Sequence, residues 1–212
     1  MIIAVDGPAA AGKGTLARRL AQHYGLAYLD TGSLYRAAGL RALRRGDPRD
    51  LAVAEAAARE VRLEDVGDPH LRDEEVGEAA SVVAAIPAVR AALLGLQRDF
   101  ARHPPGGAKG AVLDGRDIGT VVCPEADAKL FVTASLEARA DRRSRELQGA
   151  DSGTIYGRVL QDMKLRDARD SRRAVAPLQR AADALALDTT ALDADAAFAA
   201  AIEFIARKLG AH

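Results

Sequence analysis

Residues 2–15 read IIAVDGPAAAGKGT, and this stretch decides the fold. Its apolar start, closed by Asp6, is typical of a short strand that is buried on both faces of a parallel sheet. From Lys13 to His23 the apolar residues recur at helical spacing, so a glycine-rich loop joins this strand to the N-terminus of a helix. That order of elements is the context in which a loop binds phosphate.

The loop GPAAAGKGT at 7–15 contains the residue types that binding of a nucleoside triphosphate needs. Gly7 and Gly12 allow the tight curve that turns successive backbone N–H groups toward a phosphate. The helix N-terminus favours anions, and Lys13 adds a cation that can follow the transferred phosphoryl group, so we predict that Lys13 is catalytic. The predicted ATP-binding residues are Gly7, Pro8, Ala9, Ala10, Ala11, Gly12, Lys13, Gly14 and Thr15.

The loop departs at one position from the usual pattern, and this affects the expected metal site. Gly14 stands where serine or threonine normally follows the lysine, and Thr15 comes one residue later. We therefore expect Mg²⁺ as the cofactor, held mainly through water, with a weak contribution from Thr15. A second apolar run at 111–113 leads to Asp114, which is the natural partner of the Mg²⁺ hydration shell. The GKGT ending is typical of nucleoside monophosphate kinases.

Strand and helix patterns alternate along the rest of the chain. This alternation predicts an α/β protein with a five-stranded parallel sheet flanked by helices. The further strands are predicted at 26–29, 111–113, 129–133 and 184–188. The stretch 48–102 shows helical patterns and a loop at 63–73 but no strand. It therefore predicts a mostly helical insertion between elements of the sheet.

We expect one domain over residues 1–212, divided into three parts. The predicted parts are a core at about 1–47, 108–150 and 174–212, an insert that binds a nucleoside monophosphate at about 48–107, and a short lid at about 150–173.

Composition excludes several other classes of protein. Apolar residues make up 49% of the chain and charged residues 28%, and 30 basic residues balance 30 acidic ones, so bulk electrostatic binding to nucleic acid is not expected. The single cysteine, Cys123, excludes an internal disulfide, and we expect it to be a buried apolar residue. No apolar run approaches the roughly 20 residues that a membrane span needs. We expect a cytoplasmic monomer without a membrane or nucleic-acid partner.

Three segments are candidates for the site of the phosphoryl acceptor, because guanidinium groups match the geometry of a phosphate. In the segment 30–36, Thr31 can cap a helix and Arg36 follows in its first turns. Arg116 and Asp117 leave the carboxyl end of a strand, where α/β sheets bind ligands. The segment 164–173 is rich in arginine and suits a mobile lid.

Each of these segments also has a purely structural interpretation. The first is compatible with a capped helix that carries a surface arginine, and the second with an ordinary turn at the end of a strand. The third is compatible with a solvated helix face whose charges pair at i, i+3 and i, i+4 spacing. No histidine lies in these motifs, and none is required, since the attacking phosphate oxygen is already ionised near neutral pH.

Five segments in order make the chain resemble the bacterial cytidylate kinases. They are GPAAAGKGT at 7–15, LDTGSLYRA at 29–37, EAASVVAAIPAVR at 78–90, LDGRDIGTVVCPEA at 113–126 and RDARDSRRAVAPL at 166–178. The resemblance implies Mg²⁺-dependent transfer of the ATP γ-phosphate to CMP or dCMP. It also implies a P-loop kinase fold with an NMP-binding insert. The segment 63–73 is shorter than the strand-rich part of this insert in well-known members, which leaves open whether their small sheet is retained.

The resemblance also implies roles for individual residues. Thr31, Arg36 and Arg116 would hold the CMP phosphate. Ser81, Arg90 and Asp117 would read the cytosine, although Ser81 and Arg90 alone look like a helix-face serine and a surface arginine. Arg166, Asp170 and Arg173 would meet the ribose and the phosphates when the lid closes. Arg116, Arg166 and Arg173 would be catalytic together with Lys13.

Two alternative functions remain open from the sequence. A kinase for another acceptor, such as UMP, AMP or a small alcohol, would keep the phosphate loop but lack the set of Ser81, Arg90 and Asp117. A nucleotide switch of the GTPase type would carry an Asn-Lys-x-Asp string to read guanine, and the sequence has none.

Overall fold

A computed structural model describes residues 1–147 and 152–210 of the chain, without the side chains of 152–155. Its centre is one sheet of five parallel strands in the order β2-β3-β1-β4-β5. The strands are β1 (Ile2–Asp6), β2 (Ala27–Asp30), β3 (Ala111–Gly115), β4 (Ala128–Thr133) and β5 (Leu185–Asp188). The predicted α/β class and the five-stranded parallel sheet are thus confirmed.

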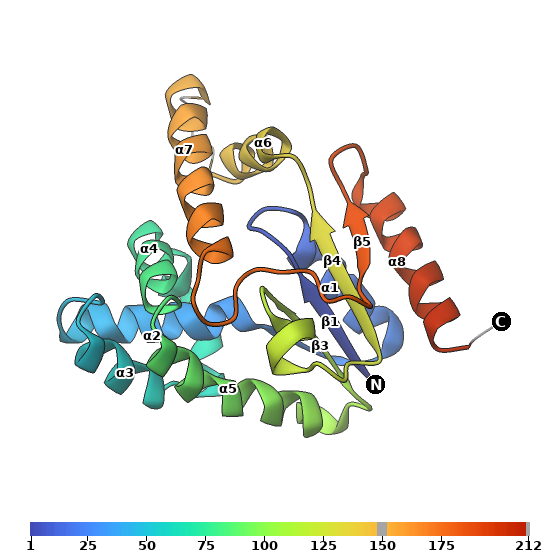
Figure 1. The fold of residues 1–212 in the computed structure, drawn as a ribbon, viewed down its shortest axis with the longest axis horizontal. Helices are drawn as coiled ribbons and strands as arrows, with labels where there is room; N and C mark the ends of the chain where they lie inside the picture. Colours follow the sequence, from blue (N-terminus) through green and yellow to red (C-terminus); the bar gives the residue numbers. More distant parts are fainter. Residues whose placement is uncertain (148–151, 211–212) are drawn as a thin grey trace.

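Helices cover both faces of this sheet (Figure 1). Their bounds are α1 (Lys13–Tyr24), α2 (Thr31–Arg45), α3 (Leu51–Arg59), α4 (Glu74–Val83), α5 (Pro87–Arg102), α6 (Leu136–Glu146), α7 (Ser152–Ser171) and α8 (Ala194–Lys208). Short 3₁₀ turns are η1 (Leu63–Gly67), η2 (Pro69–Arg72) and η3 (Pro105–Gly107), and η4 (Ile118–Val122) is a π-helical turn.

The alternation of side chains along β1 divides the apolar core in two. Ile3 and Val5 point to one face, where they pack with apolar residues of α1 and α8. Ala4 points to the other face, where α2, α4, α5 and the turn η4 contribute the buried side chains. Because both faces are covered, the strand is apolar throughout, as its sequence predicted. Cys123 lies in the second core, and burial raises the pKa of its thiol to about 11, so it is the inert apolar residue expected.

The start of α2 differs from the prediction. We expected Thr31 to cap this helix, but Asp30 is the N-cap, and its Oδ1 accepts a hydrogen bond of 2.9 Å from the Gly32 backbone N–H. The Thr31 hydroxyl instead donates to the backbone carbonyl of Asp114 over 2.8 Å. The neighbouring strand thus takes the hydroxyl, and the carboxylate one residue earlier replaces it as the cap.

Other boundaries also need correction. The segment 63–73, predicted as a loop, contains η1 and η2, and the Arg41 guanidinium holds the Asp65 carboxylate of η1 at 2.9 Å. β3 continues to Gly115, so Asp114 lies inside the strand rather than after it. The predicted boundary between core and lid near residue 150 lies outside the described residues.

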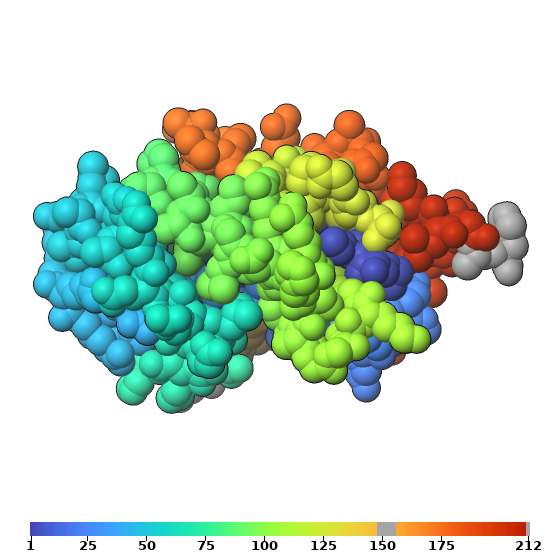
Figure 2. Space-filling model, turned by 90° about the horizontal axis from the view of Figure 1, so that it is seen from below, coloured from blue at the N-terminus to red at the C-terminus, as the bar shows by residue number. Residues whose placement is uncertain are grey.

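The segment 48–107 contains helices and turns but no strand, and every one of its residues is described. The structure therefore has no small sheet in this segment, a question that the sequence left open. Seen from below, the cyan and green residues of this segment cover the left and centre of the molecule, away from the C-terminal helix (Figure 2). No single helix among the described residues is long and apolar enough to cross a membrane. The pair 74–83 and 87–107 reaches that length and composition only together, with a bend of 100°.

The phosphate loop leaves β1 through a contact that only glycine permits. Gly7 has a φ of +144°, and a Cβ atom at this position would lie 1.9 Å from the backbone oxygen of Val132 on β4. We expect Gly7→Ala to lower the free energy of unfolding by about 3 kcal/mol or more, because loop and strand must separate. Thermal or urea unfolding followed by circular dichroism measures this loss.

Gly25→Ala is the matched control for that variant. Gly25 also has a positive φ, +64°, but a Cβ atom there meets nothing within 4 Å. The control isolates the backbone term, which costs about 1–2 kcal/mol. An equal loss in the two variants would contradict the steric argument at Gly7.

Candidate active site

The carboxyl ends of the central strands bring the candidate residues to one edge of the sheet. β1 ends at Asp6, which is paired in register with Gly115 of β3, and Asp30 of β2 is paired with Asp114. The phosphate loop begins directly after Asp6. In parallel α/β sheets this edge is where ligands bind.

Lys13 lies inside the curve of the phosphate loop. Its ammonium group donates to the carbonyl of Pro8 over 2.9 Å and lies 3.8 Å from Oδ1 of Asp114, and its side chain is only 6% exposed. Burial and then the nearby charge of Arg116 lower the pKa of Lys13 to about 8. A bound polyphosphate would oppose both effects, so the loop holds a cation that gains stability when an anion arrives.

The predicted metal-binding residues fit Mg²⁺ in their chemistry. Asp114 is buried, and a Cβ atom at Gly14 would lie 3.3 Å from its Oδ2, so this carboxylate faces the first turn of α1. Thr15 is exposed on the same turn. Among the described residues no group of three or more His, Cys, Asp or Glu side chains forms a metal cage. A carboxylate with a nearby hydroxyl suits Mg²⁺ that arrives with its own waters and the substrate phosphates.

Arg36, on α2, contacts η2 and lies close to α4. Its Nη1 donates to the carbonyl of Leu71 in η2 over 2.8 Å, and a Cβ atom at Gly77 of α4 would lie 3.3 Å from that nitrogen. Burial lowers the pKa of Arg36, and Arg143 and Arg116 act in the same direction while Asp30 opposes them. The side chain therefore lies in a basic environment rather than free on the surface.

Arg90 and Asp117 form a buried ion pair. Nη2 of Arg90 lies 2.6 Å from Oδ2 of Asp117, and the two side chains are 7% and 6% exposed. The Arg90 guanidinium also donates to the carbonyl of Ala84 over 3.2 Å and lies 5.3 Å from the ring centre of Tyr35. The interpretation of Arg90 as a surface arginine is therefore wrong. The partner of the Asp117 carboxylate is thus Arg90 on α5 of the inserted segment.

The C-terminal end of α7 closes over this pair. Asp170 is 1% exposed, and its carboxylate accepts hydrogen bonds from Arg116, at 3.0 Å, and from Arg173. Burial acts to raise the pKa of Asp170, but the three arginines Arg116, Arg173 and Arg166 outweigh it and lower the pKa overall. The predicted solvated helix face is thus wrong for this end of the helix, because its carboxylate joins two elements that lie far apart in sequence.

Two of these arginines keep buried nitrogens without a partner. Within the described part of the chain, neither Nε of Arg166 nor Nε of Arg173 has a hydrogen-bond acceptor. Burial and the charge of Arg116 lower the pKa of Arg166 to about 10. Buried donors are normally satisfied, so this arrangement suits an anionic ligand that brings its own acceptors.

Ser81 is also bound to α7. Its hydroxyl is buried and accepts a hydrogen bond of 2.6 Å from Nη1 of Arg169. A hollow of about 390 Å³ adjoins this contact and is lined by Ala85, Ala168, Arg169, Arg172, Arg173 and Ala174. Of the predicted cytosine readers, Ser81 thus contacts α7, and Arg90 contacts Asp117 in the segment after β3.

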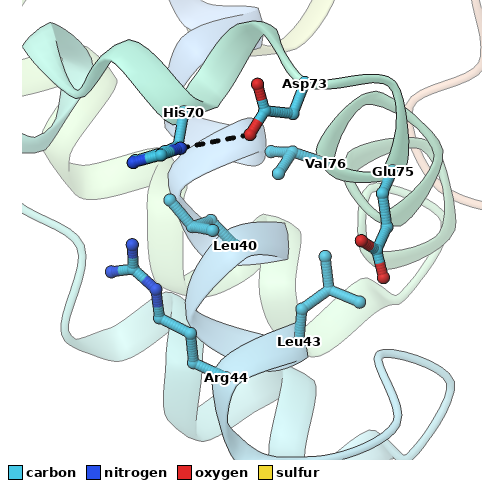
Figure 3. A pocket seen from close by; sticks show the side chains of 7 residues that line it. All are labelled: Leu40, Leu43, Arg44, His70, Asp73, Glu75 and Val76. Carbon is cyan, nitrogen blue, oxygen red and sulfur yellow. Dashed lines mark hydrogen bonds and ion pairs between the residues drawn. The ribbon is translucent and has the colours of Figure 1, made fainter.

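A second hollow, of about 300 Å³, lies between α2 and the insert. It is lined by Leu40 and Leu43 of α2, Val76 of α4, and His70 and Asp73, whose side chains are hydrogen-bonded to each other (Figure 3). None of the predicted site residues lines it. The chemistry of this hollow is separate from that of the phosphate loop.

Sequence reasoning missed three residues that support the site. Arg139 of α6 forms an ion pair with Asp167 of the lid helix, at 2.6 Å, and its Nη1 lies 3.4 Å from the carbonyl of Ala9 in the phosphate loop. Tyr35 lies beneath Arg90, and Asp6 accepts two backbone hydrogen bonds from η4. Only Asp6 had a local signal, since a lone carboxylate ends an otherwise apolar strand.

Comparison with known proteins agrees with the motifs. The family model for cytidylate kinase matches residues 3–207. The chain is 64% identical to the cytidylate kinase of Paramagnetospirillum magneticum and 60% identical to that of Rhodospirillum rubrum, with 98% of both chains covered in each comparison. A crystal structure of an uncharacterized protein from Eubacterium ventriosum shares the fold, with a TM-score of 0.54, 17% identity and 98% coverage of both chains.

The resemblance seen in five sequence segments is therefore confirmed over nearly the full chain. The chain belongs to the cytidylate kinase family, the nucleoside monophosphate kinases that transfer a phosphoryl group to CMP or dCMP.

Proposed function

We propose that this kinase transfers the γ-phosphate of ATP to CMP or dCMP with the residues assembled at the carboxyl edge of its sheet. The observation that carries the proposal is the buried pair of Arg90, on α5 of the insert, and Asp117, two residues after β3, whose side chains lie 2.6 Å apart. A buried carboxylate and a buried guanidinium side by side offer both an acceptor and donors. A pyrimidine with an amino group next to a ring nitrogen needs both.

The phosphate loop is the proposed donor site. Its backbone N–H groups and Lys13 would hold the β- and γ-phosphates of ATP, and residues 7–15 would line the bound chain of phosphates. Asp114, through water, and more weakly Thr15 would hold the Mg²⁺ that accompanies ATP. The metal ion, when bound, neutralises charge on the phosphate oxygens. Lys13 would move with the transferred group and stabilise its charge.

The acceptor phosphate would bind to Arg36, Arg116 and Thr31. The Thr31 hydroxyl donates to the Asp114 carbonyl in the structure, so it must turn to reach a phosphate oxygen. Arg116 is paired with Asp170, and a phosphate dianion would compete with that carboxylate for the guanidinium. Asp170 would then be free to accept a hydrogen bond from a ribose hydroxyl. Arg166 and Arg173 would supply their unpaired donors to the phosphates.

Catalysis in this proposal comes from positioning and from charge. The lid at about 150–173 and the insert at about 48–107 would exclude water, and the core would hold ATP. No general base is needed, because the attacking oxygen of the acceptor phosphate is ionised near neutral pH. We propose that the enzyme acts as a cytoplasmic monomer.

A coupled ADP-release assay tests the substrate directly. CMP, dCMP, UMP, AMP and GMP are compared at equal concentration with ATP and Mg²⁺. We expect turnover with CMP and dCMP, and much less with the other three. The proposal fails if UMP or AMP is the better acceptor, and the alternative kinase function would then apply.

Arg36→Ala tests the acceptor phosphate site. We expect the KM for CMP to rise by about 100-fold, because a partly buried charge contact to a dianion is lost, while the KM for ATP changes by less than about threefold. Steady-state kinetics with each substrate varied in turn measures both constants. Arg41→Ala, which removes the ion pairs to Asp65 and Glu60, is the control on the same helix. Equal effects on the two substrates would show that Arg36 is structural.

A further inference from the structure

Asp6, the last residue of β1, has a side chain that none of the roles above uses. It is 4% exposed, and each of its carboxylate oxygens accepts one backbone hydrogen bond. Ile118 donates to Oδ1 over 2.8 Å, and Gly119 donates to Oδ2 over 2.7 Å. The donors lie more than a hundred residues away in sequence, at the first two positions of the turn η4.

These two hydrogen bonds hold the backbone that carries Asp117. Asp117 comes directly before η4, with φ −143° and ψ 25°, and its carbonyl accepts from the N–H groups of Val121 and Val122. These angles belong to neither helix nor strand, so no regular element determines where its side chain points. The two N–H groups at the start of the turn have no partner within the turn, and the Asp6 carboxylate supplies it.

Asp6 also borders the phosphate loop, because Gly7 follows it in the chain. Its backbone pairs in register with Gly115, the residue before Arg116. Asp6 thus ends the strand that leads into the phosphate loop, pairs with the last residue of β3, and binds the turn that follows Asp117. A carboxylate is required at this position, since its two acceptor oxygens match two N–H donors, whereas a carboxamide has one acceptor.

The surroundings of the Asp6 carboxylate make its ionised form costly in free energy. Burial raises the pKa of Asp6 to about 6, and the Asp117 carboxylate acts in the same direction. The N–H groups of Gly119 and Ile118, and the charge of Lys13, act to lower it. The other nearby cation, Lys129 of β4, has its ammonium group paired with Asp183 at 2.9 Å. An apolar residue would avoid the cost but leave both N–H groups unpaired.

We propose that Asp6 is a positioning residue: by holding the backbone of residues 118 and 119, it sets the distance and angle at which Asp117 meets the base of the acceptor nucleotide. This inference rests on the proposed function, in which Asp117 reads that base. Asp6 touches no substrate and acts only through the turn. Asp6, which directly precedes the phosphate loop, would therefore also affect how the acceptor nucleotide is recognised.

Asp6→Asn and Asp193→Asn, compared in the ADP-release assay, test this inference. Asp193 is the control, because its Oδ1 alone accepts two backbone hydrogen bonds, from Asp195 and Ala196 at the start of α8, and a carboxamide keeps that one acceptor oxygen. We expect Asp6→Asn to raise the KM for CMP by about tenfold or more, with the KM for ATP changed by less than about twofold. The preference for CMP over UMP should shrink. Asp193→Asn keeps its acceptor oxygen and should leave the melting temperature and both KM values nearly unchanged.

Gly119→Ala disturbs the same contact from the other side and keeps the Asp6 charge. A Cβ atom there would lie 3.1 Å from Cδ of Lys129 and 3.4 Å from Oδ2 of Asp6. We expect it to raise the KM for CMP and not the KM for ATP, which provides the test if Asp6→Asn does not fold. An unchanged KM for CMP in either folded variant, or an equal rise for both substrates, overturns the inference. A wild-type enzyme without preference for CMP overturns the proposed function instead.

Discussion

Lys13→Ala is expected to lower kcat by roughly 1000-fold or more, with little loss of stability. Lys13 is the one cation in the loop 7–15, all of whose residues the structure describes. Its ammonium group lies 3.8 Å from Oδ1 of Asp114 and donates to the Pro8 carbonyl. Backbone N–H groups can still bind ATP without it. The charge that develops on the transferred phosphoryl group would then lack its mobile partner, so the loss falls on kcat more than on the KM for ATP.

The measurement is steady-state kinetics of ADP release together with thermal unfolding of the purified variant. Lys208→Ala is the control, because that lysine lies exposed at the end of α8. We expect the control to match the wild-type enzyme in both assays. Near-normal turnover of a folded Lys13→Ala enzyme would contradict the assignment of residues 7–15 as the ATP-binding loop.

Asp117→Asn is expected to lower kcat/KM for CMP by roughly 100-fold or more. In the proposed site the carboxylate accepts from the amino group of cytosine, whereas uracil presents an acceptor oxygen at that place. The carboxamide can donate, so the gap between CMP and UMP should narrow even if UMP remains a poor substrate. The variant also removes the charge partner of Arg90, which is 7% exposed, so its melting temperature should fall.

Measuring kcat/KM for CMP and for UMP in the wild-type enzyme and in Asp117→Asn separates a loss of base recognition from a loss of stability. Loss of the ion pair alone would reduce kcat/KM for CMP and for UMP by the same factor, because Arg90 and the turn at 118 would shift for either base. An unchanged ratio of CMP to UMP would therefore remove Asp117 from base recognition. The transfer reaction itself would remain, since the Asp117 side chain is bonded to Arg90, which is not one of the proposed phosphate ligands.

The phosphate loop and the strand before it could be predicted from residues 2–15 alone. Their structure depends on neighbours in the chain: an apolar run, glycines where the backbone must curve, and a helix that starts at Lys13. The five-stranded parallel sheet follows from similar local patterns, repeated along the chain. The insert could likewise be recognised as helical, since helix and strand periodicities differ within a single segment.

The partners of the site residues could not be predicted in the same way. Ser81 and Arg90 sit on helices that have no unusual pattern, and only the family resemblance singled them out. Their contacts cross long stretches of chain: Ser81 meets Arg169, and Arg90 meets Asp117. Spacing in sequence carries no information on such pairs, because side-chain contacts between elements depend on how those elements pack.

By itself, the sequence determined the α/β class, the phosphate loop and the helical insert, because each depends on interactions within one segment. Only the tertiary structure decided which groups pair. Asp30 caps α2 because the Thr31 hydroxyl is bound to the Asp114 carbonyl on another strand. Asp6 holds the turn after Asp117 because β1 and β3 are neighbours in the sheet. Burial makes such polar pairs obligatory, and only the packed fold brings the two partners within reach.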